Sequence, residues 1–182
     1  MKIAYKAFLP GFRCRGYTFK LGCMNVTEKA NCAQNGFHCA EDPADCLSYY
    51  PNIHSSVFAI VEAGGDIDED SLDSKISCTE LRIRKVLDTP TFFLHILMYM
   101  AKHKKQRCAH VSHGRGKAKN GYVIVSGRDP AASGEYGDIL AFYKETDCGD
   151  VEQIAVHIVD DETVMSGEWY NTDGERVSGN DK

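Results

Sequence analysis

Residues 35–50 read NGFHCAEDPADCLSYY, a stretch that combines a glycine, a histidine, two cysteines and a tyrosine pair. The segment GFHC predicts a short strand. The Asp42-Pro43 step predicts the start of a helix, because aspartate is a favoured N-cap and proline fits the first helical position. The helix is expected to end near Tyr49, since the residue that precedes Pro51 is disfavoured in helical backbone geometry. The stretch therefore predicts a strand that turns into a short helix.

The remaining segments predict a chain that is dominated by strands. The alternating residues 2–8 and the nearly continuous apolar run 56–63, which two glycines follow, are typical of strands. A helix is expected to begin at Thr89-Pro90 in TFFLHILMYMAKHKK. Further strands are expected in RGYTFKLG, GYVIVSG, DILAFYKE and EQIAVHIVD, and a strand or short helix is expected in ISCTELRIRKVL. We also expect a surface loop in DIDEDSLDSK and a mobile loop over 106–120. The C-terminus is expected to form a hairpin that turns at Asp173-Gly174.

These elements define the expected fold class. Strands outnumber helices, and two helices are inserted among them, which favours an α+β fold with a mainly antiparallel sheet. A chain of 182 residues is expected to form one domain. We therefore expect a single α+β domain over residues 1–177, followed by a frayed tail at 178–182.

The composition is that of an ordinary globular protein. Hydrophobic residues make up 43% and charged residues 26% of the chain, and no run of eighteen apolar residues occurs. The N-terminus lacks the apolar region of a secretory signal, so we expect a cytoplasmic protein of a bacterial host cell without membrane contact. In that compartment the eight cysteines are expected to be free thiols.

The cysteines and histidines lack the spacing of a metal or catalytic site. Neither a CxxC pair nor an HExxH motif occurs, and the cysteines from Cys14 to Cys39 are too widely spaced for a zinc knuckle. His38 and Cys39 are adjacent on a predicted strand, so their side chains point to opposite faces and cannot form a nucleophile–base pair together. The acidic loop at 66–73 lacks the glycine and final glutamate of a calcium loop. We therefore expect no metal, no cofactor and no catalytic residue.

The clearest electrostatic feature is a window of forty residues without any acid, between Asp88 and Asp129. A cationic segment with glycines suits a phosphate backbone or an acidic protein groove. A charge run is equally typical of a solvated helix end and loop. Few aromatic residues interrupt the loop, so base stacking is not indicated. The residues expected to contact a partner are Lys102, Lys104, Lys105, Arg107, Arg115, Lys117 and Lys119.

Several motifs together resemble a known group of proteins. The succession of YKxF, CRGYTFKLG, GFHC, PxD, YY and a C-terminal GEWYNTDGE is similar to a family of small uncharacterised phage and gut-bacterial proteins. Within that setting the chain resembles type II-A anti-CRISPR proteins, which inhibit Cas9-type RNA-guided nucleases. The resemblance implies a counter-defence protein of a mobile element that binds such a nuclease and blocks cleavage of target DNA without a cofactor. It leaves open whether the basic loop contacts DNA directly. The matching residues are Tyr5, Lys6, Phe8, Cys14, Arg15, Gly16, Cys32, Gly36, Phe37, His38, Cys39, Pro43, Asp45, Tyr49, Tyr50, Trp169, Tyr170, Asp173 and Gly174.

A second resemblance, carried by GFHCAEDPADCLSYY and the strand SVFAIVEAGG after it, is to the ADP-ribosyltransferase fold. It implies an NAD-binding crevice in which His38 takes the nicotinamide-stacking position and Tyr50 packs beneath it. The first strand lacks the His-Gly or Arg-Gly pair of that family, and only Glu145 and Glu152 are candidates for its late catalytic glutamate. This alternative is therefore an NAD-binding enzyme or a relative that keeps the fold for binding.

Overall fold

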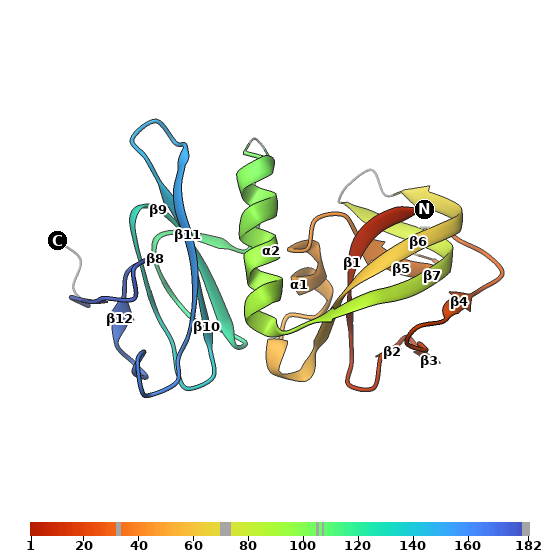
Figure 1. Cartoon of the computed structure of the whole chain (residues 1–182), viewed down its shortest axis with the longest axis horizontal. Helices are drawn as coiled ribbons and strands as arrows, with labels where there is room; N and C mark the ends of the chain where they lie inside the picture. Colours follow the sequence, from red (N-terminus) through yellow and green to blue (C-terminus); the bar gives the residue numbers. More distant parts are fainter. Residues whose placement is uncertain (32–33, 70–73, 105, 107, 180–182) are drawn as a thin grey trace. The chain divides into compact units, whose positions relative to one another are not determined.

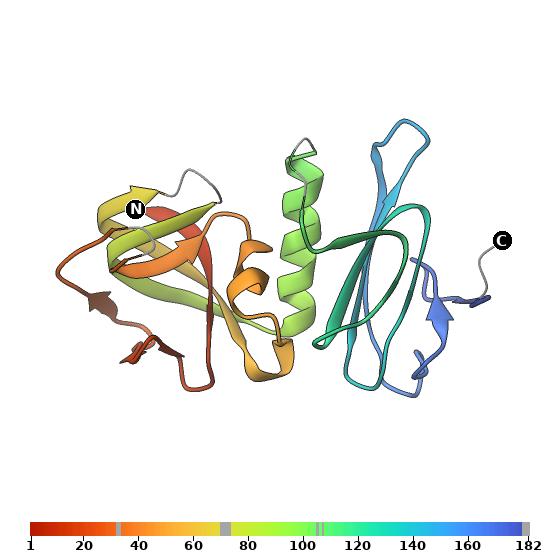
Figure 2. The ribbon, with the colours of Figure 1, turned by 180° about the vertical axis from the view of Figure 1, so that it is seen from behind.

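The structure is a computed structural model (Figure 1) that describes residues 1–31, 34–69, 74–104, 106 and 108–179. Contacts between residues divide the chain into two compact units, Met1–Asp88 and Thr89–Lys182. Strands form most of both units, and Figure 2 shows the same elements from behind. The sequence predicts one domain over 1–177 and gives no local sign of a division after Asp88.

The N-terminal unit is a closed antiparallel sheet with one short helix. Its elements are β1 (Lys2–Phe8), β2 (Arg13–Cys14), β3 (Tyr17–Thr18), β4 (Met24–Val26), β5 (Phe37–Ala40), α1 (Asp45–Tyr49), a 3-10 turn (Ile53–Ser55), β6 (Val57–Glu69) and β7 (Lys75–Leu87). The strand order is β4-β7-β5-β1-β6, and β6 also pairs with β7, so four strands close into a ring. All these pairings are antiparallel, and β2 and β3 form a separate hairpin.

The core of this unit is built from alternate positions of its strands. Ala4 and Phe8 of β1 are fully buried and share one face of the strand, because successive side chains alternate between faces. Phe8 meets Phe19 edge-on with ring centroids 5.2 Å apart, and Phe19 lies 4.8 Å from Phe37. These contacts hold the segment after the β2–β3 hairpin against β1 and β5.

Helix α1 begins at Asp45 rather than at the predicted Pro43. The expected N-cap role of Asp42 is therefore wrong. Its Oδ1 accepts a hydrogen bond from the Ala44 main-chain N–H at 2.8 Å, which closes an Asx-type turn before the helix. The helix ends at Tyr49, as the following proline predicts.

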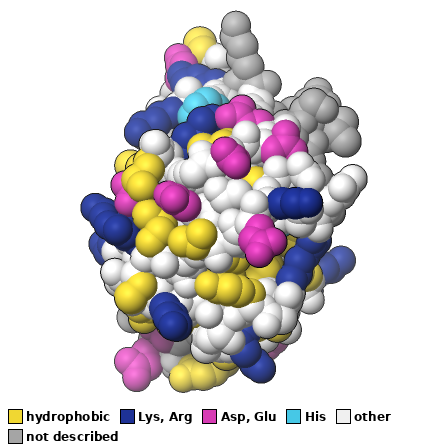
Figure 3. All heavy atoms as spheres, turned by 90° about the vertical axis from the view of Figure 1, so that its right-hand side faces the viewer, with side chains coloured by type: hydrophobic (Ala, Val, Ile, Leu, Met, Phe, Trp, Pro, Cys, Tyr) yellow, Lys and Arg dark blue, Asp and Glu magenta, His cyan; other side chains and the backbone are white. Residues whose placement is uncertain are grey.

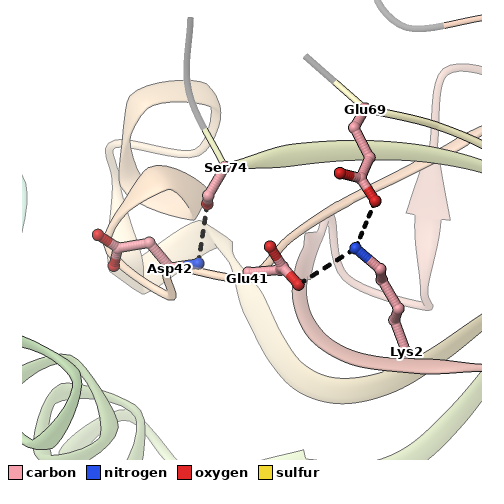
Figure 4. Close-up of polar contacts among 5 residues, drawn as sticks. All are labelled: Lys2, Glu41, Asp42, Glu69 and Ser74. Atoms are coloured by element: carbon pink, nitrogen blue, oxygen red, sulfur yellow. Dashed lines mark hydrogen bonds and ion pairs between the residues drawn. The ribbon is translucent and has the colours of Figure 1, made fainter. Parts of the chain in front are cut away.

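Polar contacts fix the turn after β5 against the neighbouring strand ends (Figure 4). The Asp42 N–H donates to Ser74 Oγ at 2.8 Å, just before β7. Lys2 Nζ donates to the Glu69 carboxylate of β6 and lies 3.6 Å from Glu41 Oε1. The ion pairs of Lys2 are exposed to solvent, so they contribute little to the free energy of unfolding.

Strand β6 continues through the two glycines at which the sequence predicts its end. It extends to Glu69, and its register with β7 shifts between Gly64 and Ile67. Gly65 adopts φ of +67°, a conformation that L side chains rarely take. The glycines therefore form a bulge, and the loop prediction is wrong as far as Glu69, whereas 70–73 lie outside the described residues. Strand β7 confirms the strand alternative for ISCTELRIRKVL.

The C-terminal unit combines a long helix with a second sheet. Its elements are α2 (Thr89–Lys102), β8 (Val111–Lys117), β9 (Tyr122–Ser133), β10 (Ile139–Glu145), β11 (Val151–Ile158), β12 (Trp169–Tyr170) and β13 (Arg176–Val177). The order is β11-β10-β9-β12-β13, with β8 paired to β9. The pairings of β9 with β8 and β10 are parallel, and the other pairings are antiparallel. The protein is thus β-rich and mainly antiparallel, with α1 and α2 as the α-helices of its described residues.

Strand β8 lies where the sequence predicts a mobile loop, so that prediction is wrong for 111–117. The letters VSHGRGK carry no hydrophobic alternation, and pairing with β9 rather than local pattern makes this segment a strand. The chain then turns through Asn120 and Gly121, at φ of +56° and +95°, between the bridged residues Lys119 and Tyr122. Both central residues are left-handed, as a type I′ turn requires.

Helix α2 presents one apolar face to its own sheet. Phe92, Phe93, Ile96 and Leu97 are fully buried, at the spacing of a single helical face. The helix contacts β10 and β11. Among the described residues, no helix combines the length and apolar character needed to cross a membrane.

Candidate functional site

A pocket of about 400 Å³ lies within the N-terminal unit. Strands β1, β5 and β7, helix α1 and the β2–β3 hairpin all contribute to its lining. The volume falls in the range of small-molecule sites. The charged and hydrogen-bonding side chains of the lining are those of Tyr5, Lys6, Arg15, His38, Asp45, Tyr49, Tyr50 and Lys75, together with the thiols of Cys14, Cys39 and Cys46.

Lys6 brings a buried ammonium group to this pocket. The residue is 4% exposed, and its Nζ donates to the main-chain oxygen of His38 at 2.5 Å. Cys14 Sγ lies 3.7 Å from Nζ, and the ring centroids of Phe8 and Phe19 lie 5.3 and 5.2 Å away. Of the described carboxylates, none forms an ion pair with Lys6. Burial of a charge without a counter-charge is costly, so this ammonium marks the pocket as a place for an anion.

Arg15 reaches the pocket from the turn of the β2–β3 hairpin. Arg15 and Gly16 adopt φ of +46° and +80°, the left-handed pair of a type I′ turn. Left-handed geometry costs a residue with a side chain about 1 kcal/mol. The hairpin thus places Arg15 and Cys14 together in the lining of the pocket.

His38 is a neutral imidazole at physiological pH. Burial lowers the pKa of His38, and the positive charges of Lys6, Arg15 and Lys75 lower it further, to about 4. Its Nε2 is buried and has no hydrogen-bond partner among the described residues. A buried ring nitrogen without a partner costs free energy, and a bound ligand could supply the missing hydrogen bond.

Tyrosines form the aromatic part of the lining. The pKa of Tyr50 is raised by burial and by its hydrogen bond with Cys14, so the phenol stays neutral. Lys75 Nζ donates to the Tyr49 hydroxyl at 3.0 Å and lies 5.4 Å from the centroid of the same ring. Burial also raises the pKa of Tyr5. At neutral pH the aromatic lining therefore adds no negative charge.

Asp45 carries the one carboxylate among the described residues that line the pocket. Its Oδ2 accepts hydrogen bonds from the Ser74 main-chain N–H at 3.0 Å and the Ser74 hydroxyl at 2.6 Å. Burial raises the pKa of Cys46 to about 12, so this thiol keeps its proton. The lining therefore presents three cations against one engaged carboxylate.

Metal binding and disulfide formation find no support in the described part of the chain. Its cysteines are all free thiols. No group of three or more histidine, cysteine, aspartate or glutamate side chains there could hold a metal ion.

The structure distributes the predicted basic residues over several environments. Lys104 Nζ lies 2.5 Å from Asp150 Oδ1 in an exposed ion pair, so an acid from outside the window compensates this charge. Lys102 is the exposed last residue of α2. Lys105 and Arg107 lie outside the described residues.

Arg115, Lys117 and Lys119 lie near one another on the C-terminal unit. The guanidinium of Arg115 is 4.4 Å from the ring centroid of Trp169, and it donates to the Ser178 main-chain oxygen at 2.5 Å. Lys117 Nζ is 6.0 Å from the same ring. Trp169 therefore supports two of the predicted cations at the end of β8.

Lys117 and Lys119 line a second pocket, of about 440 Å³, together with His110, Asn120 and Tyr122. Among the described residues, no aspartate or glutamate lines it, and neither lysine forms an ion pair. The Tyr122 hydroxyl lies 3.2 Å from His110 Nδ1. This surface, called the basic pocket below, brings two of the predicted partner residues together.

The N-terminal unit shows no surface of a single charge sign on the face seen in Figure 3. Basic, acidic and apolar side chains are interspersed over this face. A polyanion would meet repulsion as well as attraction on such a face. The basic pocket of the C-terminal unit has no such mixture.

Fold and site together define a β-rich protein of two units, with a cationic pocket in the first. The model of a domain of unknown function, DUF7666, matches residues 2–95. The chain belongs to this family, and the match includes the whole N-terminal sheet and the pocket. Neither the curated proteins nor the solved structures include a match to this chain.

Sequence reasoning identified His38 and Tyr50 as residues of one crevice, and both line the N-terminal pocket. It did not identify Lys6, Arg15 or Lys75 as site residues. In the sequence Lys6 is in phase with Lys2 rather than with Ile3 and Tyr5, so the strand alternation places it on the polar face and does not indicate its burial. No local pattern marks Arg15 or Lys75.

Proposed function

We propose that the chain is a counter-defence protein that binds a Cas9-type RNA-guided nuclease and blocks cleavage of target DNA. The GFHC-to-YY motif and GEWYNTDGE resemble a family of small phage and gut-bacterial proteins, and within that setting the size and charge asymmetry of the chain resemble those of type II-A anti-CRISPR proteins, which supports this proposal. The proposed contact is the basic pocket on the C-terminal unit, and the proposed chemistry is attraction to phosphates of the nucleoprotein. Inhibition by binding requires neither catalysis nor a cofactor.

The observation that carries the proposal is that no aspartate or glutamate among the described residues lines the basic pocket. Lys117 and Lys119 line it without an ion pair among the described residues, whereas Lys104 and Lys144 pair with Asp150 and Glu152. A cation that its own protein does not neutralise releases counterions when it meets a phosphate. Binding through this pocket should therefore weaken steeply as salt concentration rises.

The proposal is tested with guide-loaded nuclease, a target duplex and the full chain. We expect the chain to co-elute with the nuclease in gel filtration and to reduce the rate of target cleavage. Higher salt should weaken both effects, because the proposed contact is with phosphates. Absence of co-elution and of inhibition at low salt would refute the proposal.

An NAD-binding relative of the ADP-ribosyltransferases is the second candidate. One observation favours it: His38 and Tyr50, which that resemblance assigns to the nicotinamide end of a crevice, line the same pocket. Catalysis has less support than binding. The one described carboxylate in the lining, that of Asp45, is held by Ser74, and a transferase needs a carboxylate for the positive charge that develops on the sugar.

Labelled NAD distinguishes this candidate from the first. An enzyme should transfer label to a protein in a cell extract, and a binding relative should show a rise in melting temperature with NAD. If neither label transfer nor a thermal shift occurs at millimolar NAD, the second candidate is wrong.

A further inference from the structure

We propose that the pocket of the N-terminal unit binds a small organic anion that carries a planar ring, of the size of a nucleoside monophosphate. The negatively charged group would lie at the Lys6 ammonium, and the ring would lie against the tyrosines. This inference does not rest on inhibition of a nuclease, because the residues that carry it belong to the other unit.

The first argument is the unmatched charge of Lys6. An ammonium has three N–H donors, and the structure gives Lys6 one strong acceptor, the His38 main-chain oxygen at 2.5 Å. The Cys14 sulfur at 3.7 Å is a weak acceptor. A main-chain carbonyl also cannot neutralise a full charge. A ligand anion would satisfy a further donor and supply the missing counter-charge.

The second argument is that three cationic side chains and a buried ring nitrogen without a described hydrogen-bond partner belong to residues that line the same cavity. Arg15 and Lys75 come from separate elements, the β2–β3 hairpin and β7, and both line the cavity with Lys6. His38 lines it as well, and its Nε2 is a buried atom without a hydrogen-bond partner among the described residues. A phosphate or carboxylate bound there would meet charge from three sides.

The third argument concerns the remainder of the ligand. Tyr5, Tyr49 and Tyr50 give the lining an aromatic component, and aromatic faces bind planar rings. The cavity volume of about 400 Å³ is larger than an inorganic anion needs. A ligand that fills it must therefore be larger than the anionic group alone, and the tyrosines favour a planar ring as the remainder.

Calorimetric titration of the full chain with three probes tests these arguments separately. Adenosine 5′-monophosphate has the ring and the charge, adenosine has the ring alone, and inorganic phosphate has the charge alone. We expect the monophosphate to bind at least about 10-fold more tightly than either, since the ring and the charged group each add favourable contacts. Equal affinity for adenosine and its monophosphate would overturn the role of Lys6, and absence of binding by all three would overturn the site.

A matched pair of variants locates the binding. Lys6→Met should weaken binding of the monophosphate at least about 10-fold, as expected for loss of a charge-assisted hydrogen bond. Lys85→Met removes the same charge from an exposed position of β7 that does not line the pocket, and it should leave the affinity unchanged. Equal affinities of the two variants would contradict the proposed site.

Alkylation of the wild-type chain gives a readout that does not depend on the folding of a variant. Cys14 lines the pocket, whereas Cys23 is exposed and does not. We expect saturating monophosphate to slow the reaction of Cys14 with iodoacetamide several-fold and to leave Cys23 unaffected, as measured by mass spectrometry. Equal rates at Cys14 with and without the probe would place any binding outside this pocket and refute the inference.

Discussion

The Lys6 ammonium donates a hydrogen bond to the main-chain oxygen of His38, 2.5 Å away. Strands β1 and β5 are paired at Tyr5 and Ala40, so this side chain links them beyond their backbone pairing. The same positive charge helps to lower the pKa of the His38 imidazole. One buried residue thus contacts the neighbouring strand and contributes to the electrostatic character of the pocket.

Replacement of Lys6 by methionine should not destabilise the protein. Methionine fills a similar volume without a buried charge, and such replacements are often neutral or stabilising. The His38 oxygen loses its donor, which offsets part of the gain. We expect the free energy of unfolding in urea to be between unchanged and about 2 kcal/mol higher. A loss of stability would show that Lys6 is chiefly a structural link, with Lys85→Met as the near-neutral reference.

The low pKa of His38 predicts a loss of stability in mild acid. The folded imidazole stays neutral down to about pH 4, while the unfolded one takes up a proton near its ordinary pKa of 6.5. The stabilising contribution is therefore complete above pH 6.5 and declines as the pH falls toward 4. We expect the urea midpoint to fall between pH 7 and pH 5, and to fall less in His38→Gln. His54→Gln, at an exposed position of the 3-10 turn, should keep the wild-type pH dependence.

At Asn25, replacement of one heavy atom is expected to have a large effect on stability. The residue is 2% exposed, its Oδ1 accepts from the Lys20 N–H at 2.9 Å, and its Nδ2 donates to the Lys20 and Leu81 oxygens, each at 3.1 Å. Asn25→Asp turns the donor into an anionic acceptor that faces carbonyl oxygens. We expect a loss on the order of 3 kcal/mol in the free energy of unfolding.

The control for this prediction is Asn52→Asp. Asn52 Oδ1 accepts from the His54 N–H at 3.0 Å, a role that a carboxylate keeps. The control should therefore stay within about 0.5 kcal/mol of the wild-type protein. Similar losses at both positions would mean that the amide donors of Asn25 are unimportant.

The sequence predicts those elements whose residues show the hydrophobic periodicity of a strand or a helix. Strand β1 occupies the predicted range 2–8, and α2 begins at the predicted Thr89, because alternation and a helical apolar face are local properties. Strand β8 could not be predicted, since its glycine-rich letters become a strand only through pairing with β9. The bulge at Gly64 and Gly65 likewise depends on the register with β7.

The candidate site, like the fold, could be predicted only in part from the sequence. The motif that contains His38 and Tyr50 points to a crevice, and both residues line one pocket. The charge of that pocket depends on a hairpin turn and on two separate strands that carry Lys6 and Lys75, so it follows from tertiary structure alone. In the basic window, Lys104 forms an ion pair with Asp150, which lies outside the window. A segment without acidic residues can therefore be neutralised in part by an acid from elsewhere in the chain.

Inhibition of a guide-loaded nuclease by two charge-matched variants is the most direct test of the proposed function. Lys117→Gln with Lys119→Gln neutralises the basic pocket, whereas Lys104→Gln with Lys144→Gln removes the same charge from lysines that are already paired. We expect the first variant to lose inhibition of target cleavage and to lower the dependence of log affinity on log salt by roughly 2, with the second close to wild type. Equal inhibition by both variants across salt concentrations would show that the basic pocket is not the contact surface.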